Sequence, residues 1–225
     1  MVKTFKLKPK QLNYFYNLLG HEKEYGGNLK IIKNNVIIVY EKKGENFKVR
    51  MNFQGEYDLS YHTHAYLANL SFSVIEIFKT IKNEIFKLNL NKGLYLFEAN
   101  IMKIHPPSPQ DCKLCSIQKN MLVFTQEGIY FMKYKNNTML SHKDILDIER
   151  QYYKNMWGTT EQNVRKHISS NNPNNIMKIL YSCQSHRNKV TYYKSIHEYI
   201  KFIKTKNIYC KLIPWNYAQN HIFTI

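Results

Sequence analysis

The chain has 225 residues, of which 44% are hydrophobic and 14% aromatic, a composition typical of a globular protein with one well-filled core. No apolar run approaches the roughly 20 residues that a membrane-spanning helix needs, so we expect no membrane span. Residues 1–11 carry lysines but no apolar segment of the kind that a secretory signal contains, which favours an intracellular location in the cytoplasm or nucleus.

Basic residues outnumber acidic ones by 33 to 16, which gives a formal net charge of +17. Such an excess can neutralise the phosphates of a nucleic acid. The lysines are spread over all segments, however, and Lys, Asn, Ile and Tyr are abundant throughout, as in the product of an AT-rich gene. No nucleic-acid-binding motif accompanies the charge, so a nucleic-acid partner is kept only as an alternative.

The first part of the chain predicts a helix followed by strands. Apolar side chains recur at helical spacing over residues 8–20 and a glycine ends the pattern, so we expect a helix there. Strands are predicted, in chain order, at 29–41 (a hairpin turning at Lys33-Asn34-Asn35), at 46–53 and at 57–61. The last of these delivers His62-Thr63-His64 at its end.

The rest of the chain mixes both kinds of pattern. Residues 71–90 predict an amphipathic helix and 93–101 a strand-like run, and 119–135 predict two strands of the same sheet, joined at Glu127-Gly128. Beyond these we expect, in order, helices at 141–155 and 159–169, a loop at 169–175, an apolar run at 176–181, a helix at 193–204 and a strand-like stretch at 208–215.

These elements predict a mixed α/β fold of the α+β type, with a mixed central sheet flanked by helices. We expect a core over residues 1–140, with an insertion at about 66–104 that contains the helix. A largely helical C-terminal extension over 141–225 is expected to pack on this core. The pattern alone leaves open whether the end of the chain stays in the extension or returns to the sheet.

A His-x-His pair stands at the end of the strand predicted at 57–61. Side chains alternate along a strand, so His62 and His64 point to the same side and can bind one metal ion. Asp111 follows a proline-rich, stiff segment and is the natural third ligand. A catalytic zinc commonly has three protein ligands and a water. The pattern predicts one zinc ion per chain, although a single His-x-His among nine histidines is by itself a weak signal.

The order of these residues resembles the JAMM (MPN-type) zinc metallopeptidase family over residues 8–135. Glu24 follows the first helix, then come His62-Thr63-His64, Ser108-Pro109-Gln110-Asp111 and the Glu127-Gly128 turn. The resemblance implies an MPN fold with a cytidine-deaminase-like layout, with His62, His64 and Asp111 as zinc ligands. It further implies Glu24 as the base, Ser108 as a donor to the oxyanion, and a protein substrate conjugated to ubiquitin or a related modifier.

Two departures from the family pattern support alternatives. Ala65 stands where the family has a proline, and the connection from His64 to Ser108 is long, so a segment must be looped out as a lid or as a structural excursion. An inactive MPN-like scaffold and a basic nucleic-acid-binding protein therefore remain alternative functions. Glu22 and Glu41 are rivals for the base; the adjacent Gly26-Gly27 favours Glu24.

The four cysteines support a second hypothesis for a metal or redox site. Cys112-x-x-Cys115 could form half of a structural zinc site completed by Cys183 and Cys210, or a redox pair. The other two cysteines stand alone, which disfavours both readings. We expect reduced thiols in an intracellular chain. A helix that begins at Asp111 would place Cys115 four residues further on, facing the protein core.

Overall fold

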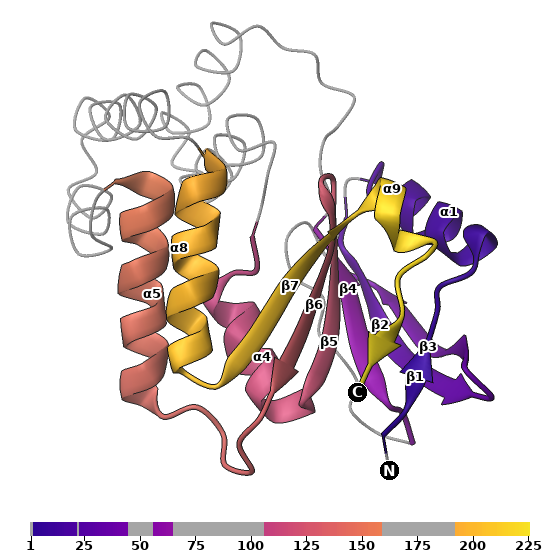
Figure 1. Cartoon of the computed structure of the whole chain (residues 1–225), viewed down its shortest axis with the longest axis horizontal. Coiled ribbons are helices and arrows are strands. Elements are labelled where there is room, and N and C mark those ends of the chain that lie inside the picture. The colour runs from indigo at the N-terminus through magenta and orange to yellow at the C-terminus, as the bar shows by residue number, and fades with distance from the viewer. Residues whose placement is uncertain (1, 22, 45–55, 65–105, 159–191) are drawn as a thin grey trace, which may run out of the picture. The chain divides into compact units, whose positions relative to one another are not determined.

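The computed structural model describes residues 2–21, 23–44, 56–64, 106–158 and 192–225 (Figure 1). Its elements are β1 (Thr4–Phe5), α1 (Pro9–Leu18), β2 (Tyr25–Ile32), β3 (Asn35–Lys43), β4 (Leu59–Thr63), α4 (Pro109–Gln118), β5 (Asn120–Thr125), β6 (Gly128–Tyr134), α5 (His142–Trp157), α8 (Tyr192–Thr205), β7 (Ile208–Pro214), α9 (Trp215–Ala218) and β8 (Phe223–Thr224). The chain divides into two compact units, Met1–Asn69 with Ile104–Leu140 and Ile203–Ile225, and Leu70–Lys103 with Ser141–Phe202.

The first unit is built on a six-stranded sheet in the order β3-β2-β4-β5-β6-β7 (Figure 1). The β4–β5 pair is parallel and the other pairs are antiparallel, so the sheet is mixed. The expected α/β class with a mixed central sheet flanked by helices is confirmed. The parallel pair places the C-terminal ends of β4 and β5 at the same edge, which is where the His-x-His sequence lies.

The hairpin predicted at 29–41 is confirmed as β2 and β3. Lys33 and Asn34, the two residues of its turn, both have positive φ angles, of 47° and 64°. Positive φ at both central positions defines a type I′ turn, whose twist matches that of the flanking strands. A register shift between Asn28 and Leu29 adds a bulge to the pairing with β3.

The hydrophobic core of the first unit lies between α1 and one face of the sheet. Phe15 of α1 is fully buried, stacks on Phe124 of β5 at 4.1 Å between ring centroids, and meets Tyr61 of β4 edge-on at 4.9 Å. Leu12 and Leu18 lie on the same side of α1 and belong to the same cluster. Spacing of three residues along the helix explains why these side chains share one face.

The opposite face of the sheet is covered by α4, which packs against β5, β6 and β7. Because side chains alternate along a strand, the neighbours of Tyr61 in β4 point away from α1 and toward this second face. Ser60 donates a hydrogen bond to Gln118 of α4, and Cys112 and Cys115 of α4 are fully buried. The two faces of β4 thus separate the apolar core from a partly polar layer.

Other predicted elements that fall within the described residues are confirmed with small changes in their bounds. The helix at 8–20 is α1, the strand pair at 119–135 is β5 and β6, and the helices at 141–155 and 193–204 are α5 and α8. The strand at 57–61 is β4, which begins and ends two residues later. The elements predicted at 46–53, 71–90, 93–101, 159–169, 169–175 and 176–181, and the insertion at 66–104 as a whole, lie outside the described residues.

The end of the chain returns to the sheet, which is one of the two outcomes that the sequence left open. Residues Ile203–Ile225 belong to the first unit, and the strand-like stretch at 208–215 is β7, the strand beside β6. It pairs with β6 over its whole length, from Ile208 opposite Tyr134 to Pro214 opposite Gly128. The division at residue 140 and the packing of residues 141–225 on the core stay predictions.

The chain ends also meet within the first unit. The short strands β1 and β8 pair antiparallel, and the rings of Phe5 and Phe223 stack at 4.9 Å between centroids. Both rings are fully buried. Trp215 of α9 donates from Nε1 to the carbonyl of Thr125, at 2.9 Å, and so ties α9 to the end of β5.

In the second unit α5 and α8 lie side by side (Figure 1). Asn155 donates a hydrogen bond to the Ser195 carbonyl at 3.3 Å, and the rings of Tyr152 and Tyr199 meet edge-on at 5.4 Å. Ser141 caps the N-terminus of α5, and Gly158 ends it in the left-handed conformation. Of the helices that the structure describes, none has the length and apolar character that a membrane crossing needs.

Candidate metal centre

Two histidines project from the end of β4 toward the α4 face of the sheet. His62 lies between Gly26 of β2 and Val123 of β5, so its position is fixed by strands on both sides. His64 follows the last residue of β4, and its backbone N–H donates to the Phe124 carbonyl at 2.9 Å. Their separation by two residues along an extended chain puts both imidazoles on the same face.

Asp111 comes from the first turn of α4, where a capping box holds it. Ser108, the N-cap residue, accepts a hydrogen bond through Oγ from the Asp111 backbone N–H at 3.2 Å. In return the Ser108 backbone N–H donates to Asp111 Oδ2 at 2.6 Å. Pro109 at the first helical position fixes the entry of the chain. The carboxylate therefore has a defined orientation that is set by backbone groups.

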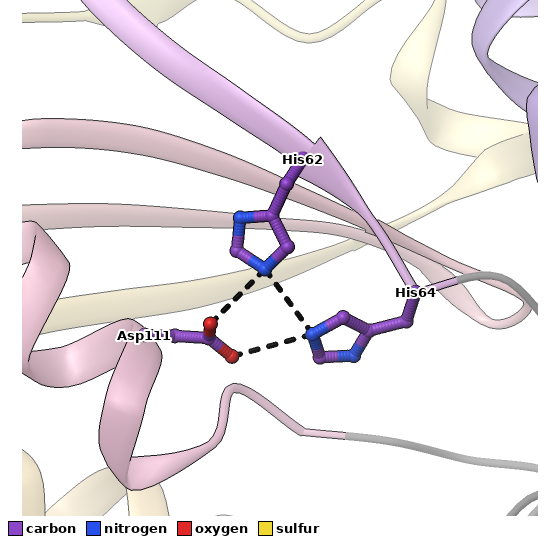
Figure 2. Close-up of side chains that lie close together, drawn as sticks. All are labelled: His62, His64 and Asp111. Carbon is purple, nitrogen blue, oxygen red and sulfur yellow. Dashed lines mark hydrogen bonds and ion pairs between the residues drawn. The ribbon is translucent and has the colours of Figure 1, made fainter. Parts of the chain in front are cut away.

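The three predicted ligands converge (Figure 2). His62 Nε2 lies 3.0 Å from Asp111 Oδ1, and His64 Nε2 lies 3.3 Å from Asp111 Oδ2. The two Nε2 atoms are 3.2 Å apart. His62 and Asp111 are buried, and the His64 side chain keeps 14% of its exposure, so solvent reaches the group from the His64 side.

The triangle of ligand atoms fits a small tetrahedral cation. Bonds of about 2.0–2.1 Å to a tetrahedral zinc place neighbouring ligand atoms about 3.3 Å apart, close to the separations observed between the three residues. Hydrogen bonds alone do not account for all three contacts. A ring nitrogen that donates its proton to Asp111 has neither a second proton nor a lone pair for the other ring. A central cation accepts lone pairs from all three groups together.

The charges at this site reinforce one another. Burial opposes ionisation of Asp111, but the charge and hydrogen bonds of His62 and His64 hold the pKa of Asp111 well below its usual range. Burial also opposes protonation of His64, yet Asp111, with Glu24 and Glu127, raises the pKa of His64 to about 9. The surroundings are therefore strongly negative, and they favour a cation, whether a proton or a metal ion.

Glu24 lies on the same face, beside the histidines. The Gly44 N–H donates to the Glu24 carbonyl at 2.7 Å, so the pairing with β3 continues one residue before β2 begins. Extension of the β2–β4 register from Gly26 opposite His62 places Glu24 opposite His64. Burial raises the pKa of Glu24, and the charges of His64 and His62 act against this rise. The predicted base is thus within electrostatic reach of the ligands.

Glu41, one of the two other candidates for the base, lies on the opposite face of the sheet from the histidines. Glu41 pairs in register with Gly27, which places it on the α1 face, and its carboxylate accepts hydrogen bonds from Tyr14 and Tyr61. It is therefore on the wrong side of the sheet to serve His62 and His64. Glu22 lies outside the described residues.

Ser108, predicted as a donor to the oxyanion, is the N-cap of α4. Its Oγ uses a lone pair to accept from the Asp111 N–H, and the hydroxyl proton is left for another acceptor. The cap explains why a serine suits this position in the fold. Its role toward a substrate stays a prediction.

The cysteines that the structure describes lie outside the group of His62, His64 and Asp111. Cys112, Cys115 and Cys210 are buried, and burial raises the pKa of the Cys115 and Cys210 thiols well above its usual value. Among the residues that the structure describes, the grouping suited to a metal ion is His62, His64 and Asp111. Cys183 lies outside them. A raised pKa keeps these thiols protonated in the metal-free protein, which lowers their reactivity.

Glu127 lies near the site, although the sequence indicates for it only a place in a turn. The β5–β6 turn that carries it lies beside His64, because the His64 N–H donates to the carbonyl of Phe124, three residues before Glu127. The charge of His64 also acts on the Glu127 carboxyl. Glu127 is brought near His64 by the parallel pairing of β4 with β5. A single sequence does not show which strands pair, so it gave no signal for this position.

Comparison of the chain with models of known families, with curated proteins and with solved structures finds no match. The geometry and chemistry of the site are therefore the basis on which its function is inferred.

The two serine N-caps offer a matched test of how Asp111 is held. Ser108→Ala and Ser141→Ala each remove a side-chain oxygen that accepts from an aspartate N–H at the third helical position. Each should cost about 0.5–2 kcal/mol of stability in thermal or urea unfolding. Only Ser108→Ala should also weaken zinc binding, because only Asp111 faces the histidines. Equal zinc affinities in both variants would show that the cap does not position the carboxylate.

Zinc affinity should rise with pH. Below a pKa of about 9 the His64 ring is protonated in the metal-free protein, so zinc must displace a proton to bind. The apparent association constant should therefore increase about tenfold per pH unit between about pH 6 and about pH 8. Competition against a chromophoric chelator of known pH dependence measures this slope. An affinity that stays constant over this range would contradict proton displacement.

Proposed function

We propose that this protein is a zinc-dependent hydrolase that cleaves amide bonds. The observation that carries the proposal is the convergence of His62 Nε2, His64 Nε2 and the Asp111 carboxylate at 3.0–3.3 Å. Two imidazoles and one carboxylate are a common protein ligand set for a catalytic zinc, which keeps a further position for water or substrate. When bound there, a zinc ion would lower the pKa of water to about 7 and polarise a carbonyl group.

Two residues of the chain, Glu24 and Ser108, have separate roles in the proposed amide hydrolysis. Glu24 takes a proton from the attacking water and gives it to the leaving amine, a transfer that needs a carboxylate beside the ligands. Burial raises the pKa of Glu24, which suits a group that must hold a proton between these two steps. Ser108 donates its hydroxyl proton to the oxygen that becomes negative in the tetrahedral state.

The substrate class follows from the resemblance to the JAMM family. The order Glu24, His62-x-His64, Ser108-x-x-Asp111 and the arrangement of α1 and α4 on opposite faces of a mixed sheet support an MPN-like fold. On this basis the substrate is a protein carrying ubiquitin or a related modifier on a lysine side chain, and the bond cleaved is the isopeptide bond.

The proposal is tested with zinc content and activity measured on the same samples. The wild type should contain about one zinc per chain, and it should cleave a fluorogenic modifier–lysine conjugate. Glu24→Gln should keep the zinc and lose about 10²–10⁴-fold in kcat, because the base is removed while the ligands remain. Glu41→Gln, which alters a glutamate on the α1 face, is the matched control and should keep both properties.

The outcomes separate the competing functions. Zinc in the wild type without cleavage of any conjugate favours the inactive MPN-like scaffold. Cleavage that survives Glu24→Gln contradicts the assignment of the base. A wild type that neither contains nor takes up zinc contradicts the metallohydrolase altogether.

A further inference from the structure

The helix α8 presents a row of basic side chains to solvent. Its members are exposed and follow one another at intervals of three or four residues, which places them on one face of the helix. They are Lys194, His197, Lys201 and Lys204, and we call them the α8 basic face. At a rise of about 1.5 Å per residue the row is about 15 Å long.

The charge of the α8 basic face is not neutralised within the protein. None of its four residues forms an ion pair with a residue that the structure describes, whereas Arg150 of α5 pairs with Asp147 at 3.3 Å. Glu198, the acidic residue of α8, lies beside the row and forms no ion pair with Lys194 or Lys201. Three lysine charges are therefore available to a partner, with one carboxylate beside them.

The other side of α8 is already used inside the protein. The ring of Tyr199 meets Tyr152 of α5 edge-on at 5.4 Å. The side chains buried on this side are Ser195, Ile196, Tyr199 and Ile203. A helix that binds a membrane surface needs its apolar side free to enter the lipid. Since the apolar side of α8 is packed, an anionic membrane is a poor partner for the basic face.

Double-stranded DNA fits this surface better than other polyanions. Its backbone carries one negative charge per about 1.7 Å of axis, so a row of about 15 Å faces several phosphates. Its major groove, about 12 Å wide, admits an α-helix, whereas the major groove of duplex RNA is deep and narrow. Single strands are held largely by stacking on aromatic rings, and the described side chains of the basic face include no phenylalanine, tyrosine or tryptophan.

We propose that the α8 basic face binds the phosphate backbone of double-stranded DNA without regard to its sequence. The lysines contact phosphate oxygens and release the counterions condensed on the duplex. The excess of basic over acidic residues in the whole chain, 33 against 16, attracts the duplex from a distance, and α8 supplies the contact. This activity is separate from the proposed hydrolysis and needs no metal ion.

The test measures binding of the full chain to a short labelled DNA duplex by fluorescence anisotropy, from about 50 to about 200 mM salt. The triple variant Lys194→Gln/Lys201→Gln/Lys204→Gln should lose about 10-fold or more in affinity at about 50 mM salt. The slope of log affinity against log salt should become shallower by about 0.9 for each lysine that contacts a phosphate.

The matched control is Lys10→Gln/Lys42→Gln/Lys135→Gln, which removes the same charge from exposed lysines outside α8 and should keep most of the affinity. Glutamine has a helix propensity close to that of lysine, so both variants should fold, which thermal unfolding verifies. Equal weakening in the two variants would show that net charge alone drives binding, and would overturn the assignment to α8.

The choice of partner is tested on the wild type with two further probes. These are a single strand of the same sequence and vesicles of anionic phospholipid, each compared with the duplex at the same salt concentration. Tighter binding to the duplex than to either probe is the expected result. A wild type that does not bind the duplex at about 50 mM salt, or that binds either probe more tightly, overturns double-stranded DNA as the partner.

Discussion

The position of the Asp111 carboxylate determines what this site can do. Backbone groups of the α4 cap hold it on one side and two imidazoles approach it on the other, at 3.0 and 3.3 Å. A buried charge is strongly destabilising when it loses its partner. The N-terminus of α4 and the end of β4 must therefore come together for Asp111 to be paired with the two histidines. A ligand set built on helix and strand ends in this way is preorganised for a cation.

Successive side chains of β4 alternate between the apolar core and the metal centre. Tyr61 points into the apolar core beneath α1, whereas His62, the next residue, points toward α4. The same alternation places Glu24, the residue before β2, on the histidine side of the sheet and Glu41 on the core side. A shift of one residue in the β2–β4 register would exchange these faces and remove the site, so the register is as important as the residues themselves.

Local signals predicted much of this arrangement. The spacing of His62 and His64, the stiff segment before Asp111 and the hairpin signal at Lys33-Asn34 each depend on nearby residues, and all were interpretable from one sequence. Two features depend on pairing between distant segments, and local signals left the first open and did not indicate the second. The return of the chain end as β7 follows from its pairing with β6, and the place of Glu127 beside His64 follows from the parallel β4–β5 pair.

X-ray absorption at the zinc edge on the zinc-loaded protein tests whether His62, His64 and Asp111 bind the metal, because it identifies the atoms bonded to it. We expect nitrogen and oxygen neighbours at about 2.0–2.1 Å, two of them with the multiple-scattering pattern of imidazole, and no sulfur. His62→Ala should reduce the imidazole signal. Sulfur neighbours at about 2.3 Å would move the metal to the cysteines and contradict the assignment of His62, His64 and Asp111 as its ligands.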